Sequence, residues 1–85
     1  MSVTLRYWAA AKDAAGLAEE AFDVPRTVAE LLSEAAERHP DGRLGRVLAR
    51  CAFLVDGEPV GLRPHESVSL HPGAVVEALP PFAGG

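Results

Sequence analysis

Two strand-like patterns stand near opposite ends of this 85-residue chain, and helical patterns lie between them. Residues 2–8 alternate, with Val3, Leu5 and Tyr7 on one face, which is the period of a half-buried strand. A last strand is predicted over residues 74–79, begun after a Pro-Gly turn. Because a long stretch of chain separates them, the two segments can pair side by side at the centre of one sheet.

Further strands are predicted between these two. One covers residues 19–24 and forms a hairpin with the first, across a small-residue loop or short helical turn at 9–16. Another covers residues 52–55 and turns at Asp56-Gly57, and a short one covers residues 67–70. The chain therefore holds about five strands for one sheet.

Two helices are predicted in the middle of the chain. Thr27 and Glu30 form a capping box, in which the Thr27 hydroxyl accepts a hydrogen bond from an orphan amide and Glu30 reaches back to Thr27. A helix begins there and ends at residues 40–42. Its apolar stripe, which faces the sheet, consists of Val28, Leu31, Leu32 and Ala35. Residues 44–51 repeat the same spacing more briefly and predict a short second helix.

The order strand, strand, helix, short helix and further strands is typical of an α+β domain of the β-grasp, or ubiquitin-like, fold. We expect a single domain over residues 1–79, with a mixed sheet, and a flexible tail over residues 80–85. A four-stranded split βαβ sandwich is the competing topology, because the pattern alone does not separate the two.

Length and charge exclude several function classes. A chain of 85 residues builds one small core and has no room for a substrate pocket with its own catalytic machinery, which favours a carrier subunit over a self-sufficient enzyme. The net charge of −4 disfavours nucleic-acid binding. No apolar run is long enough to span a bilayer, and no apolar leader opens the sequence, so no membrane contact and a cytoplasmic location are expected.

The tail has a composition suited to insertion into another protein. Its residues are Pro80, Pro81, Phe82, Ala83, Gly84 and Gly85. Glycine has no Cβ to clash with a narrow channel, and the two prolines restrict the backbone and so reduce the entropy lost when the tail is captured. We therefore expect the terminal carboxylate to be the group that does chemistry; the alternative is a frayed chain end, which has the same composition.

Two segments resemble the sulfur carriers of the MoaD and ThiS type. Residues 8–16 are similar to the aromatic-Ala-x-x-basic-acidic-x-x-Gly segment that follows the first strand in this family. Residues 73–85 resemble its closing strand with Pro-Pro-x-x-Gly-Gly. The resemblance spans essentially the whole chain and implies a β-grasp fold and service as the small subunit of molybdopterin synthase. One departure is Ala74, where the family usually has an aspartate that caps the turn.

The resemblance also implies a chemistry for the tail. An ATP-dependent activating enzyme would adenylate Gly85, sulfur transfer would make a thiocarboxylate there, and the tail would enter a large subunit that builds the molybdopterin dithiolene. The carrier itself would be non-catalytic and bind no cofactor or metal. The alternatives are a carrier for thiamine, cysteine or tRNA thiolation, or a ubiquitin-like protein modifier, although a single lysine, Lys12, fits poly-chains poorly.

Strand parity predicts a docking surface at the root of the tail. Trp8 and Leu79 lie on the strand faces opposite the core, and with Val75 and Phe82 they are expected to form an exposed apolar patch, unless the short helix or a loop covers Trp8. Lys12 follows the first strand close to this patch and can meet an acidic partner. Arg6 and Glu77 would share the face as an ion pair.

The remaining candidate residues are predicted to have no chemical role. The histidines, His39, His65 and His71, lack the spacing of metal ligands and are expected on the solvated surface. Cys51 falls on an apolar stripe, which predicts a buried and inert thiol.

Overall fold

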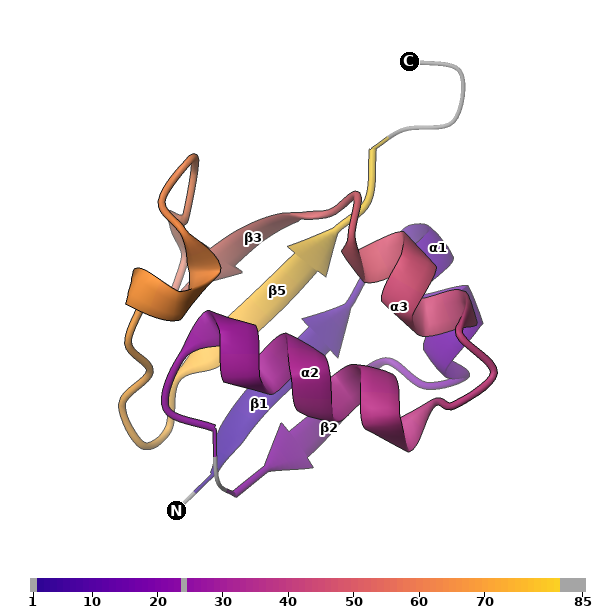
Figure 1. Cartoon of the computed structure of the whole chain (residues 1–85), viewed down its shortest axis with the longest axis horizontal. Coiled ribbons are helices and arrows are strands. Elements are labelled where there is room, and N and C mark those ends of the chain that lie inside the picture. Colours follow the sequence, from indigo (N-terminus) through magenta and orange to yellow (C-terminus); the bar gives the residue numbers. More distant parts are fainter. Residues whose placement is uncertain (1, 24, 82–85) are drawn as a thin grey trace.

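The computed structural model describes residues 2–23 and 25–81. A five-stranded sheet runs in the order β2-β1-β5-β3-β4 (Figure 1). The strands are β1 (Val3–Tyr7), β2 (Glu19–Phe22), β3 (Ala52–Val55), β4 (Glu58–Pro59) and β5 (Val75–Leu79). The helices are α1 (Ala9–Ala15), α2 (Val28–Arg38), α3 (Arg43–Leu48) and the 3-10 turn η1 (His65–Ser67).

The first and last strands form the centre of the sheet, as predicted. β1 pairs with β5 in parallel, with Leu5 opposite Val76. β2 and β3 pair antiparallel on the outer sides of this central pair, so the sheet is mixed. The pairing of the first strand with the last, within a sheet of five strands in this order, confirms the β-grasp arrangement and excludes the four-stranded sandwich.

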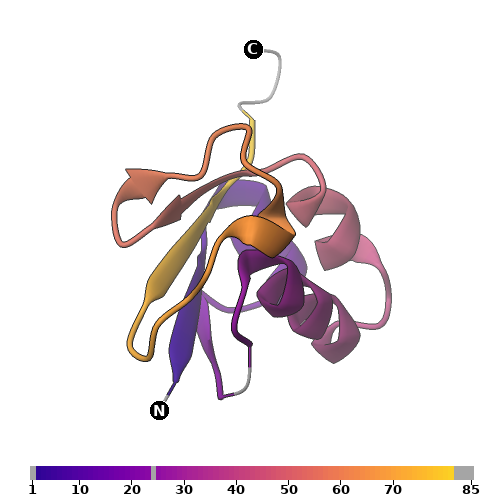
Figure 2. The ribbon, with the colours of Figure 1, turned by 60° about the vertical axis from the view of Figure 1, so that its left-hand side comes forward.

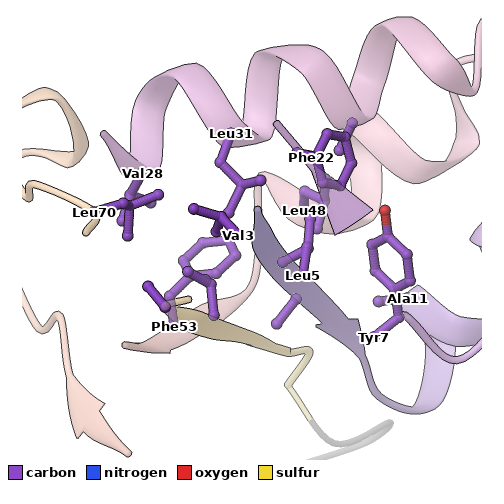
Figure 3. Close-up of a cluster of buried hydrophobic side chains, with 14 of the residues drawn as sticks. Val3, Leu5, Tyr7, Ala11, Phe22, Val28, Leu31, Leu48, Phe53 and Leu70 are labelled. Atoms are coloured by element: carbon purple, nitrogen blue, oxygen red, sulfur yellow. The ribbon is translucent and has the colours of Figure 1, made fainter. Parts of the chain in front are cut away.

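The helices cover one face of the sheet and leave the other open (Figure 2). The alternating residues of β1 and β5 bury one set of side chains against α2, which contributes the fully buried Leu31. Figure 3 shows this core at close range. Its largest fully buried side chains are Tyr7, Phe22, Leu5, Leu31, Leu44, Val28 and Val76.

The start of α2 follows the predicted capping box with one difference. The Glu30 amide donates a hydrogen bond to Thr27 Oγ1 at 3.1 Å, as expected. The Glu30 carboxylate, however, accepts from the backbone amide of Arg26 at 2.8 Å and not from that of Thr27. Both hydrogen bonds of a capping box are therefore present, but the Glu30 side chain bonds to the amide one residue before the predicted one.

The segment at 9–16, for which a loop and a helical turn were both open, is helical. α1 ends at Gly16, whose φ of 79° is the left-handed conformation that closes many helices. The Gly16 amide donates to the carbonyl of Lys12 at 2.9 Å, which satisfies one of the last carbonyls of the helix.

The fourth strand is wrong as predicted at residues 67–70. Ser67 ends η1, where its hydroxyl donates to the Pro64 carbonyl at 2.7 Å, and Ser69 forms only an isolated bridge with Thr27. Val68 is buried, so the alternation there reflects contact with the core and not a strand of the sheet. The fourth strand is β4, a two-residue edge strand that pairs with the end of β3.

His39 is not a solvated surface residue, contrary to the prediction. Its Nε2 lies 2.7 Å from Glu20 Oε1, which also accepts a hydrogen bond from the Tyr7 hydroxyl at 2.7 Å. Burial, followed by this bond, raises the pKa of Tyr7. Burial alone would raise the pKa of Glu20, but the bonds from Tyr7 and His39 outweigh it and lower that pKa. The cluster joins the end of α2 to β2.

Candidate docking surface at the root of the tail

The tail leaves the domain from the end of the central strand β5. Pro80 is half-buried and Pro81 is exposed directly after Leu79. The predicted tail residues Phe82, Ala83, Gly84 and Gly85 lie outside the described residues. The site is therefore described up to the two prolines.

The face of the sheet opposite the helices carries the side chains that alternate with the core. We call it the outer face. On the three central strands and the residue that follows β1, it consists of Thr4, Arg6, Trp8, Ala52, Leu54, Val75, Glu77 and Leu79. Each strand places its other residues in the core, so the parity predicted from the sequence agrees with the structure.

Trp8 lies beside the end of β5, on the outer face. Its side chain is 45% exposed, so neither a helix nor a loop covers it. Its backbone amide donates to the Ala78 carbonyl at 3.3 Å, and its indole Nε1 donates to Glu77 Oε1 at 3.1 Å. The two bonds hold a large apolar ring in an open position next to Leu79.

Val75 does not belong at the root of the tail, where the sequence placed it. It is opposite Thr4, at the other end of β5 from Leu79. Strands rise about 3.3 Å per residue, so four positions separate Val75 from Leu79 by about 13 Å. Strand parity gives the face of a residue but not its position along the strand.

Two residues of β3 complete the apolar surface, and the sequence reasoning missed them. Ala52 is opposite Leu79, and Leu54 is opposite Glu77. We call Trp8, Ala52, Leu54 and Leu79 the docking patch. The alternation of residues 52–55 about the buried Phe53 was the available signal for the two β3 residues.

Arg6 and Glu77 are register partners but do not form the predicted pair. Arg6 Nε lies 3.3 Å from Glu19 Oε1, on the neighbouring strand β2. Glu77 accepts instead from the Trp8 indole. Arg6 lies between Glu19 on β2 and Glu77 on β5, and Glu77 is already hydrogen-bonded to the Trp8 indole. The exposed Arg6–Glu19 pair is worth at most about 1 kcal/mol.

Lys12 lies one helical turn beyond Trp8. Its amide donates to the Trp8 carbonyl at 3.4 Å, and its side chain is exposed on α1. It is thus near the docking patch but belongs to the helical layer. Its contact with a partner stays a prediction.

Asp56 takes the part of the family aspartate that is missing at Ala74. Its Oδ1 accepts from the Val75 amide at 2.9 Å, and its Oδ2 lies 2.7 Å from His71 Nε2. The backbone bond from Val75, then the bond with His71, lowers the pKa of Asp56, and the same contact with Asp56 raises the pKa of His71. The start of β5 is therefore capped from the β3–β4 turn. His71 is exposed on the surface, as predicted, although it is hydrogen-bonded there. The surface prediction is wrong for His65, which is half-buried with its ring edge-on to that of Phe53.

Cys51 is half-buried against the core, whereas the sequence predicted a buried thiol. Its Sγ donates to the Val47 carbonyl at 3.3 Å, and burial raises the pKa of its thiol to about 11. Within residues 2–23 and 25–81, no group of three or more His, Cys, Asp or Glu side chains is placed to hold a metal ion. In the same part of the chain, no helix has the length and apolar character to cross a membrane.

A mixed sheet of this strand order, with its helices on one face and a tail leaving the central strand, defines a ubiquitin-like β-grasp domain. A family model described as the ThiS family matches residues 5–85, and the chain belongs to this family of sulfur carriers. Over 87 aligned residues it is 30% identical to the molybdopterin synthase sulfur carrier subunit of Chlamydomonas reinhardtii, with the whole of both chains covered.

Solved structures share the fold. Small archaeal modifier protein 1 from Methanosarcina acetivorans matches with a TM-score of 0.80 and 20% identity, over 99% of this chain and 96% of that one. A complex of subunits 1 and 2 of molybdopterin-converting factor from Helicobacter pylori 26695 matches with a TM-score of 0.68 and 23% identity, over the whole of both chains. At these identities the likeness concerns the fold alone.

Proposed function

We propose that this protein is the sulfur carrier subunit of a molybdopterin synthase. The observation that carries the proposal is full-length similarity, at 30% identity, to a curated subunit of that name. The docking patch beside Pro80 and Pro81 supports it, because an apolar surface at the root of an inserting tail suits a large-subunit partner. The tail composition, Pro-Pro-x-x-Gly-Gly, is the further support from the sequence.

The proposed chemistry begins with activation of the Gly85 carboxylate. A carboxylate is a poor acyl donor, so the activating enzyme uses ATP to make an acyl-adenylate and releases pyrophosphate. A sulfur donor of the persulfide class then attacks the carbonyl carbon, and AMP leaves with the former carboxylate oxygen. Reductive cleavage of the resulting acyl disulfide by a thiol leaves a thiocarboxylate on Gly85. This soft nucleophile stays ionised at neutral pH.

The rest of the chain positions this group for its acceptor. The docking patch holds the large subunit on the outer face, and the side-chain-free Gly84 and Gly85 pass into the active site of the partner. Pro80 and Pro81 keep the tail extended between the two. The carrier supplies the sulfur and the address, while the large subunit supplies the catalytic groups.

Intact-mass spectrometry tests the carrier function. Incubation with the cognate activating enzyme, ATP and a persulfide donor should exchange one terminal oxygen for sulfur and add about 16 Da. A variant that lacks Gly85 should gain nothing and keep its melting temperature, because a chain end contributes little to stability. An unchanged mass of the full chain with a verified activating enzyme would contradict the proposal.

A protein modifier is the second candidate, and the fold similarity to small archaeal modifier protein 1 favours it. Activation of Gly85 is common to both functions, but a modifier ends in an amide bond to a lysine of a target. Incubation of the thiocarboxylate form with the large subunit and its pterin substrate separates them. Sulfur loss to the pterin supports the synthase, whereas covalent conjugates with protein targets would support the modifier.

A further inference from the structure

A groove runs between α1 and α3, two helices that lie side by side in the helical layer (Figure 1). It is open to solvent and has a volume of about 400 Å³. One wall comes from α1 and the other from α3 and the turn that follows it. The lining residues are Ala10, Asp13, Ala14, Arg43, Arg46, Val47 and Arg50. None of them belongs to the outer face, so this groove is separate from the docking patch.

Three arginines dominate the charge of the groove. Arg43 and Arg46 lie three residues apart on one side of α3, and Arg50, in the turn that follows the helix, lines the same groove. All three are exposed. The chain carries eight lysines and arginines against twelve acids, and three of the eight cations meet here. The groove is a positive surface on a negative protein.

These arginines are not consumed by pairing within the described structure. Arg6 and Arg38 lie within ion-pair distance of Glu19 and Glu20. Among residues 2–23 and 25–81, no acidic side chain comes within ion-pair distance of Arg43, Arg46 or Arg50. Asp13 lies on the facing wall, and the Asp41 carboxylate accepts a hydrogen bond from the backbone amide of Arg43 at 3.0 Å. Guanidinium groups without a partner favour external carboxylates, which they bind through two parallel hydrogen bonds.

Apart from Asp13, the rest of the lining is apolar. Ala10, Ala14 and Val47 present small side chains, which leave room for a side chain of an incoming segment. The groove therefore offers apolar contact along its length and positive charge on one wall. A segment with acidic side chains on one side and apolar ones on the other fits both features.

We propose that the groove between α1 and α3 is a docking site for an acidic amphipathic segment of a partner protein. A nucleic acid fits less well, because its long phosphate backbone would meet the negative surface beyond the groove. The groove and the docking patch share no residue. The proposal does not depend on the sulfur chemistry of Gly85.

NMR titration of the full chain with a nine-residue peptide of the repeat Glu-Glu-Leu tests this. Amide signals of residues 10–14 and 43–50 should shift, and the binding should weaken as salt is added. Replacing all three arginines, as Arg43→Gln, Arg46→Gln and Arg50→Gln, should raise Kd by about tenfold or more. Arg26→Gln removes the same charge as Arg46→Gln from an exposed position outside the groove, and should leave Kd unchanged.

Several outcomes would overturn the proposal. The first is the absence of shifts with millimolar peptide, and the second is a set of shifts centred on the outer face. The third is an equal loss of peptide affinity in the single variants Arg26→Gln and Arg46→Gln. Tighter binding of a single-stranded oligonucleotide at the same salt would assign the groove to nucleic acid, and equal binding of pyrophosphate would assign it to small anions. Trp8→Ala should leave peptide binding intact, which separates this test from that of the docking patch.

Discussion

The indole Nε1 of Trp8 donates a hydrogen bond to the carboxylate of Glu77, across the boundary between the two central strands. The bond spans 69 positions of sequence and fixes an exposed aromatic ring beside the point where the tail leaves the domain. A fixed aromatic anchor loses less conformational entropy on binding than a free one. This relationship makes the docking patch a prepared surface.

Trp8→Ala is expected to weaken binding of the large subunit by roughly 1 to 4 kcal/mol, the range for loss of an aromatic anchor. Isothermal titration calorimetry measures this, and thermal unfolding should change little because the ring is exposed. Ser33→Ala is the control, since Ser33 is exposed on α2, on the side of the sheet opposite the patch, and the variant should bind as the wild type does. Unfolding of the Trp8 variant would show instead that the ring supports the core.

Leu31→Ala is expected to lower the free energy of unfolding by roughly 2 to 5 kcal/mol. Leu31 lies on the buried face of α2 and is fully buried, so truncation removes apolar contacts and leaves a cavity. Urea unfolding followed by circular dichroism gives the value. Leu62→Ala truncates a fully exposed side chain and is the control. A loss in Leu31→Ala no larger than the loss in Leu62→Ala would contradict the prediction.

The Asp56–His71 contact predicts a stability difference that depends on pH. The pKa of His71 is raised above its usual 6.5, so its contribution is complete below pH 6.5 and is lost as pH rises through the raised pKa. The pKa of Asp56 is lowered below 3.8, so its contribution is complete above pH 3.8 and is lost as pH falls through the lowered pKa. The free energy of unfolding of the wild type should therefore exceed that of Asp56→Asn by the largest margin between pH 3.8 and pH 6.5.

An NMR titration of the His71 ring checks the same contact directly. Asp56→Asn should lower the pKa of His71 towards its ordinary value, because the largest cause of the rise, the side-chain bond to Asp56, is removed. An unaltered His71 titration would contradict the contact.

Cys51 should react slowly with thiol reagents in the folded protein. Burial raises the pKa of its thiol to about 11, from an ordinary 9.0. The thiolate at pH 8 is then about a hundredfold scarcer than that of an exposed cysteine. Ellman's reagent measures the rate in the folded protein and in urea, and equal rates would contradict the prediction. The Cys51 thiol takes no part in the proposed chemistry, so the variant Cys51→Ser should still accept sulfur at Gly85.

The sequence was sufficient for the central features of the fold. Alternation in residues 2–8 and 74–79, with turns on either side, located β1 and β5 because both are half-buried strands with a clear period. It was not sufficient for β4, which has two residues and no period to detect. The alternation of Val68 and Leu70 misled in the opposite direction, because burial at the end of the core imitates a strand.

The candidate site was predictable in its faces and not in its distances. Parity placed Trp8 and Leu79 opposite the core, whereas the position of Val75 along β5 required the register with β1. Glu77 has two neighbouring donors, Arg6 and the Trp8 indole, and it bonds to the indole. The sequence pattern does not indicate which of the two donors bonds to it. The groove between α1 and α3 arises from packing of two helices far apart in sequence.

The order of the strands ties presentation of the tail to completion of folding. β5 is the last element of the described chain, yet it lies between β1 and β3 in the sheet. A chain shortened before Val75 would hold two separate ribbons, β2 with β1 and β3 with β4, with no strand in common. The centre of the sheet thus closes only when the segment bearing the tail has been added during synthesis. The docking patch takes its residues from β3, from β5 and from the position after β1, so it is complete only when β5 is in place.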